Sequence, residues 1–161
     1  MLTAAGIHGR IGASFVGHDI HVEFDGESLT GRMGGRVFGK DIRFHFSGSR
    51  LWGRWGGGMD GKDASFDMDQ TSLFGRMGGG MAGRDLSLTF SDSTITGRLG
   101  GQTVGKDVLL HCDFDGRMQG RIGGQFAGKD VEADVAGVPW LVAAAVICCV
   151  FWQLELNSRS N

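Results

Sequence analysis

The sequence predicts an all-β fold built from six copies of a 22-residue unit and followed by one hydrophobic helix. Three observations predict it: an octet of the type G-G-x-x-x-G-[KR]-D recurs, apolar and polar residues alternate after each octet, and the end of the chain is almost entirely apolar. A fixed spacing between copies is typical of repeat architectures. Apolar residues at every second position are typical of half-buried strands.

The octet at residues 34–41, GGRVFGKD, is one letter short of the phosphate-binding loop G-x-x-x-x-G-K-[ST]. In that loop the last residue supplies the hydroxyl that ligates magnesium, whereas here it is Asp41, whose charge would repel phosphate. Ile42, Phe44 and Phe46 then alternate as in a strand. Because related octets begin at glycines 12, 56, 78, 100 and 123, the motif marks a repeat and not a nucleotide site.

Each unit opens with a Gly-Arg pair, and the pairs follow one another at intervals of 22 residues four times and then 23. Two strands are predicted for each unit. The second crosses the Gly-Arg pair, as in Leu51-Gly53-Trp55, with Arg54 on the other face. The inward positions of the first strands are Ile20/Val22/Phe24, Ile42/Phe44/Phe46, Ala64/Phe66/Met68, Leu86/Leu88/Phe90, Val108/Leu110/Cys112 and Val131/Ala133/Val135.

Two folds suit such a unit. The leading prediction is a β-solenoid of six 22-residue two-strand repeats, in which each unit is one coil and strands stack in parallel, because constant spacing gives every coil the same path. The alternative is a closed antiparallel barrel, or a trefoil-like fold, of six hairpins. In either fold, a strand glycine opposite a bulky residue lets two sheets approach closely.

The repeat also places charged residues at equivalent positions, which are the candidate site residues. In a solenoid the arginines would form one column of like charges, one strand apart, which is unfavourable. We expect the aspartates nine residues later to neutralise them. The columns consist of Arg10, Arg32, Arg54, Arg76, Arg98 and Arg121, and of Asp19, Asp41, Asp63, Asp85, Asp107 and Asp130.

In its period alone, the strand-turn-strand unit resembles the curli subunits, which are secreted bacterial fibre proteins. This chain has Gly-Arg and Lys-Asp where curli repeats carry Ser, Gln and Asn. It is more loosely similar to bactofilins, bacterial β-solenoid polymers with a shorter repeat. These resemblances imply self-assembly, but they assign no role to any individual residue of this chain.

Composition limits the function. The net charge of -2 over 161 residues, with acid and base balanced in each unit, argues against a nucleic-acid partner. Three cysteines without disulfide-like spacing suit a reducing compartment. No catalytic constellation, cofactor site or metal site is predicted. Since the first ten residues do not resemble a secretion signal, we expect the protein in the cytoplasm or on the cytoplasmic face of a membrane.

The chain is divided into a repeat domain (1–135), a hydrophobic tail (136–156) and a polar end (157–161). Residues 138–152 carry no charged side chain. Three alternatives remain for the tail: a membrane anchor, a cap over the last coil, or an added strand. The anchor or cap residues are Trp140, Leu141, Val146, Ile147, Phe151 and Trp152.

The predicted function is a non-enzymatic structural or self-assembling module, tethered or capped by its tail. Self-association would use the open sheet edge at residues 7–11. One alternative is a membrane-active pore or effector whose tails cluster in the bilayer. Another is an ion- or carbohydrate-binding β-domain that uses the charge columns.

Overall fold

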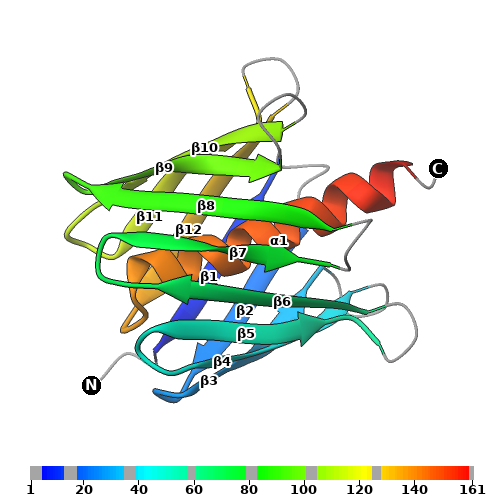
Figure 1. Ribbon diagram of the computed structural model, residues 1–161, viewed down its shortest axis with the longest axis horizontal. Coiled ribbons are helices and arrows are strands. Elements are labelled where there is room, and N and C mark those ends of the chain that lie inside the picture. Colours follow the sequence, from blue (N-terminus) through cyan, green and yellow to red (C-terminus); the bar gives the residue numbers. More distant parts are fainter. Residues whose placement is uncertain are drawn as a thin grey trace.

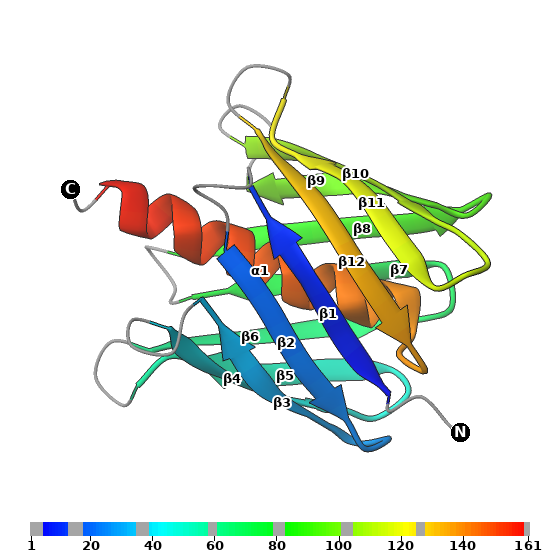
Figure 2. The ribbon, with the colours of Figure 1, turned by 180° about the vertical axis from the view of Figure 1, so that it is seen from behind.

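The structure is a computed structural model that describes residues 5–12, 18–34, 39–57, 61–78, 83–100, 105–124 and 128–159. The strands of this part follow one another in chain order around a closed barrel, and the helix α1 (Trp140–Arg159) runs through its interior (Figures 1 and 2). The strands are β1 (Gly6–Ile11), β2 (His18–Phe24), β3 (Ser28–Met33), β4 (Lys40–Phe46), β5 (Arg50–Trp55), β6 (Lys62–Met68), β7 (Ser72–Met77), β8 (Arg84–Ser91), β9 (Thr94–Gly100), β10 (Gly105–Cys112), β11 (Arg117–Ile122) and β12 (Lys129–Ala136).

The leading prediction of a β-solenoid is wrong, and the alternative of a closed antiparallel barrel is confirmed. Consecutive strands pair antiparallel, so Arg32 of β3 lies opposite Asp41 of β4, and Arg54 of β5 lies opposite Asp63 of β6. The arginines of the column then recur only on alternate strands, roughly 10 Å apart, with an aspartate of the other column between them. The charge pattern therefore fits a meander, whereas a parallel stack would bring like charges together.

Closure of the barrel also changes the prediction about sheet edges. Strand β1 pairs with β2 along one side and with β12 along the other, and Ile7 lies opposite Val22 and Val135. Residues 7–11 therefore offer no free edge to a second copy. Self-association stays a prediction, but it needs another surface. The likeness to curli subunits in period, and the looser one to bactofilins, do not extend to the path of the chain.

The repeated octet is the connection between a Gly-Arg strand and the following Lys-Asp strand. Gly34, Gly56 and Gly78, the residues that follow β3, β5 and β7, have φ values of 82°, 90° and 83°, a conformation that favours glycine. Residues 35–38 of the GGRVFGKD octet lie outside the described residues. The flanking residues show that this octet joins two antiparallel strands and does not open a helix.

Helix α1 is the core of the barrel. The prediction of a helix is confirmed. Every residue from 141 to 152 has at most 4% of its surface exposed, because strands surround it. An all-round apolar helix is expected in such a buried position. The prediction had assigned residues 157–159 to a polar end, whereas α1 extends through them to Arg159.

The barrel wall adapts to the helix. Among the strands, α1 lies closest to β7, β8 and β9. The largest fully buried side chains, Trp55, Phe44 and Phe66, come from β5, β4 and β6, and they fill the space between these strands and the helix. Two sheets do not meet across a thin core as predicted, because the helix lies between opposite walls.

One buried hydrogen bond joins the wall to the helix. The indole N–H of Trp55 donates to Oε1 of Gln153 at 2.9 Å, and Nε2 of Gln153 donates to Oδ1 of Asn157 at 2.8 Å. Gln153 is only 6% exposed. The same indole ring packs edge-on against Trp152 with 6.0 Å between ring centroids. This polar contact fixes the rotation of the helix relative to β5.

We expect Gln153→Leu to lower the free energy of unfolding by about 1–3 kcal/mol. The leucine side chain has a volume similar to that of glutamine, but it leaves the buried indole N–H of Trp55 without an acceptor. Urea denaturation measures the change. Gln119→Leu, at an exposed position on β11, is the control. Equal effects of the two substitutions would show that α1 does not make this contact.

Candidate functional site

The charge columns form pairs along the outside of the barrel. All six arginines contact the aspartate nine residues later, with N···O distances of 2.6 Å for Arg10, 2.6 Å for Arg32, 2.9 Å for Arg54, 2.8 Å for Arg76, 2.5 Å for Arg98 and 2.6 Å for Arg121. The aspartates are well exposed, so each pair contributes little to stability. The structure brings each Arg to its Asp but does not gather the pairs into one site.

These arginines also hold backbone. Arg32 donates to the carbonyl of Gly39 at 3.1 Å, Arg54 to that of Gly57 at 3.0 Å, and Arg121 to that of Gly124 at 3.0 Å. One guanidinium thus joins an aspartate on the next strand to a carbonyl of the connection between the strands. The repeated Gly-Arg and Lys-Asp letters therefore have a structural explanation.

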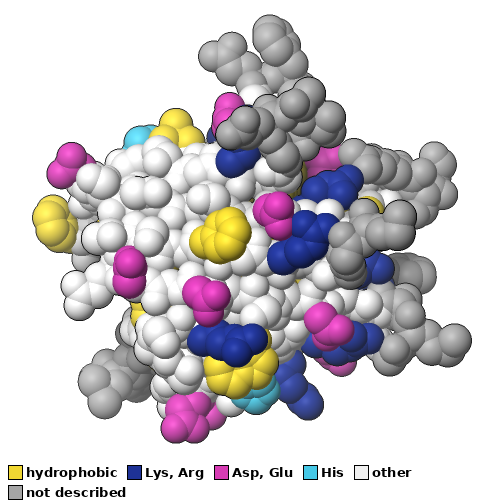
Figure 3. Space-filling model, in the orientation of Figure 1, with side chains coloured by type: hydrophobic (Ala, Val, Ile, Leu, Met, Phe, Trp, Pro, Cys, Tyr) yellow, Lys and Arg dark blue, Asp and Glu magenta, His cyan; other side chains and the backbone are white. Residues whose placement is uncertain are grey.

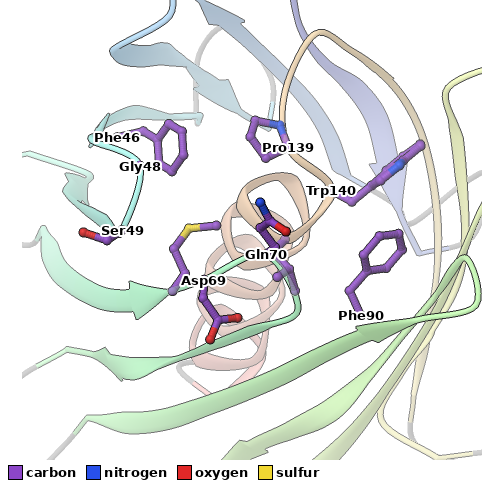
Figure 4. Close-up of a pocket in the computed structure, with 10 residues that line it drawn as sticks. Phe46, Gly48, Ser49, Asp69, Gln70, Phe90, Pro139 and Trp140 are labelled. Atoms are coloured by element: carbon purple, nitrogen blue, oxygen red, sulfur yellow. The ribbon is translucent and has the colours of Figure 1, made fainter.

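A pocket opens at the opposite end of the barrel, where α1 begins. We call it the mouth pocket, and its volume is about 460 Å³. Apolar side chains from three strands and from the start of the helix line it, with polar residues from two turns at the rim (Figure 4). Its lining residues are Phe46, Gly48, Ser49, Met68, Asp69, Gln70, Phe90, Pro139, Trp140 and Leu141.

The repeat explains how the chain builds this pocket. In β4, β6 and β8 the first two inward residues are buried under the helix, whereas the third, Phe46, Met68 or Phe90, is only partly buried. The carbonyl of Pro139 accepts the N–H of Ala143 at 3.1 Å, so the helix begins beside these three side chains. Figure 4 shows Pro139 and Trp140 at the start of the helix, with Phe46 on one side of them and Phe90 on the other.

The rim of the mouth pocket is negatively charged. The carboxylate of Asp69 accepts the backbone N–H groups of Thr71 at 2.8 Å and Ser72 at 2.9 Å. These two hydrogen bonds, Thr71 first, hold the pKa of Asp69 below its ordinary value, so the carboxylate stays ionised at neutral pH. The rim therefore disfavours the binding of a ligand with an anionic group.

Sequence reasoning missed the mouth pocket, because its residues come from three repeats and the tail. The sequence predicts the third residue of each first strand to face inward like the other two, and it does not show that Phe46, Met68 and Phe90 are only partly buried. Of the six tail residues predicted as anchor or cap, Trp140 and Leu141 line the pocket and the other four lie deeper inside the barrel. The Pro-Trp pair at the start of the helix was the signal available in the sequence.

The cysteines do not form a reactive centre. Burial raises the pKa of Cys148 to about 12, that of Cys149 well above its ordinary value and that of Cys112 to about 11. Thiols with such pKa values are hardly ionised at neutral pH and are poor nucleophiles. Within the described ranges, no group of three His, Cys, Asp or Glu side chains is placed to hold a metal ion.

No protein-family model, curated protein or solved structure matches this chain. The fold alone gives the class of this protein, which is a closed antiparallel β-barrel filled by its own C-terminal helix. By length and composition α1 is also able to cross a membrane over Trp140–Asn157, with a mean hydropathy of 1.6, although 78% of that segment is buried inside the barrel.

Proposed function

We propose that this protein is a non-enzymatic binding barrel whose mouth pocket holds the apolar part of an amphiphilic ligand. The observation that carries the proposal is the pocket's construction: Phe46, Met68, Phe90 and Trp140 line it, and its polar groups lie at the rim. Ligand sites are mostly apolar concavities with a few polar groups that orient the ligand. A volume of about 460 Å³ lies within the range of such sites.

The rim supports a statement about the ligand's head. Asp69 is ionised, and it is one of the residues that line the pocket, together with Gln70 and Ser49. A cationic head gains attraction from this carboxylate, a neutral head can hydrogen-bond to the rim, and an anionic head is repelled. The ligand class is therefore a neutral or cationic amphiphile with one short alkyl chain.

The test compares three probes that share a dodecyl chain: dodecylammonium, dodecanol and dodecanoate, each below its micellar concentration. Binding is measured on the full chain by calorimetry. We expect saturable binding of the ammonium and the alcohol and at least tenfold weaker binding of the carboxylate. Asp69→Asn keeps the acceptor oxygen of the turn and should abolish the preference for the ammonium.

Two matched variants locate the binding. Phe90→Ser removes a side chain that lines the pocket, whereas Val135→Ser removes an apolar one at the equivalent repeat position of β12, outside the pocket. We expect binding to weaken at least tenfold in Phe90→Ser alone. Absence of saturable binding, or the same loss in both variants, contradicts the proposal.

A second candidate function is membrane binding through α1, which the hydropathy of Trp140–Asn157 favours. In this proposal the helix leaves the barrel and inserts into a bilayer, as a tether or, when several chains cluster, as a pore. Flotation of the purified protein with liposomes tests the tether, and dye leakage tests the pore. Protein that stays unbound at every lipid concentration rules out both.

A further inference from the structure

The outer face of β4 and β5 differs from the rest of the barrel. In a near-regular repeat, a cluster found in one place marks a specialised surface. Arg43, His45, Arg50 and Trp52, which we call the Trp52 platform, all point outward, since their neighbours Ile42, Phe44 and Leu51 are buried. At the position of Trp52 the other units carry His8, Thr30, Phe74, Thr96 and Gln119. None of these combines an aromatic ring with three neighbouring basic side chains.

The platform is preassembled. His45 lies directly opposite Trp52, with 5.6 Å between the ring centroids, and Cζ of Arg50 lies 5.9 Å from the centroid of the Trp52 ring. Arg50 also donates to Oγ of Ser65 at 3.0 Å. Trp52 is still 38% exposed. Figure 3 shows basic, hydrophobic and histidine side chains next to one another on this part of the surface.

The charges of the platform are not neutralised as they are in the columns. In the part of the chain that the structure describes, no carboxylate forms an ion pair with Arg43 or Arg50. Asp67 lies opposite Arg50 in the register without pairing with it. Two guanidinium groups therefore remain available for an anionic ligand group, which arginine recognises through two parallel hydrogen bonds.

A groove continues from the platform toward the β4–β5 turn. It has a volume of about 430 Å³, and Glu27, Ser28, His45 and Trp52 are among its lining residues. Carboxylate and hydroxyl oxygens in such a groove accept hydrogen bonds from hydroxyl groups. The groove thus offers acceptors for hydroxyls, an aromatic face for an apolar ring face, and cations for a negative group.

We propose that the Trp52 platform binds an acidic carbohydrate, a pyranose that carries a carboxylate. The C–H face of the sugar packs on Trp52, its hydroxyl groups bond to Glu27 and Ser28, and its carboxylate meets Arg43 or Arg50. A nucleic acid fits less well, because two arginines without an ion pair are few for binding a phosphate backbone. This site is separate from the charge columns and does not depend on the mouth pocket.

Binding of galacturonate oligomers to the full chain tests the proposal, with galactose oligomers and oligo(dT) of matched length as comparisons. We expect saturable binding of the galacturonate alone. Trp52→Ala should weaken it at least tenfold, and Arg50→Gln at least fivefold. Phe74→Ala, at the equivalent exposed position on β7, should leave it unchanged, and melting curves establish that each variant is folded.

Several results overturn the proposal. Equal binding of galactose oligomers removes the role of the arginines, and tighter binding of oligo(dT) makes the platform a nucleic-acid site. Undetectable binding at millimolar galacturonate, or the same loss in Phe74→Ala as in Trp52→Ala, shows that the platform is not a carbohydrate site.

Discussion

A chain cut after Gly137, which lacks α1, is expected not to fold into the barrel. The apolar side chains of Val142, Val146, Ile147, Val150 and Phe151 are 0% exposed. Burying each contributes about 1.5–3 kcal/mol, so these five alone match a typical net stability of about 5–15 kcal/mol. Removal of the helix also exposes the inward residues of the strands. A thermal melt followed by circular dichroism should show no cooperative unfolding, and size-exclusion chromatography should show no compact monomer.

The control for this truncation is a chain cut after Arg159, which keeps the whole of α1 and should melt as the full chain does. The comparison separates the loss of the helix from the general effect of a shortened terminus. A chain ending at Gly137 that is monomeric and unfolds cooperatively would show that the strands close without a helix inside them.

The second large effect is expected for Gly75→Ala, a single methyl group added to β7. A Cβ at Gly75 would lie 2.1 Å from the carbonyl oxygen of Ser65, 2.6 Å from Cα of Phe66 and 2.7 Å from Cδ1 of Phe66. The first two neighbours are backbone, so relief requires β6 and β7 to move apart. We expect a loss of about 3 kcal/mol in the free energy of unfolding.

Gly124→Ala is the matched control, because a Cβ at Gly124 meets no atom within 4 Å. Its stability should change by less than about 0.5 kcal/mol. Urea denaturation of both variants gives the comparison. A small change in the free energy of unfolding for Gly75→Ala would mean that close contact between the strands does not require glycine at this position.

Much of the fold followed from the sequence, and one step failed for an identifiable reason. The alternation in segments such as Ile42/Phe44/Phe46 predicted strands, and the apolar tail predicted a helix; the structure contains both. Period alone does not distinguish parallel coils from an antiparallel meander, because both repeat every two strands. The arrangement of Arg32 and Asp41 carried that information, since only antiparallel neighbours place them opposite each other.

The position of the helix was harder to predict. An all-round apolar segment is equally suited to a bilayer and to the interior of a barrel. The interior requires a wall that closes around it, which depends on the pairing of β1 with β12, more than 100 residues apart in the chain. The mouth pocket and the Trp52 platform also need this closure and register, and local patterns do not supply them.

Thiol accessibility tests the central claim, that α1 fills the barrel, most directly. Cys148 and Cys149 are at most 1% exposed on α1. In a Cys112→Ser variant, these two residues are the remaining cysteines of the chain. The variant is treated with iodoacetamide in buffer without lipid or detergent. Light scattering verifies that it is monomeric. We predict labelling at least about 100-fold slower than in urea. Rapid labelling of both cysteines in a folded, monomeric protein would contradict the account.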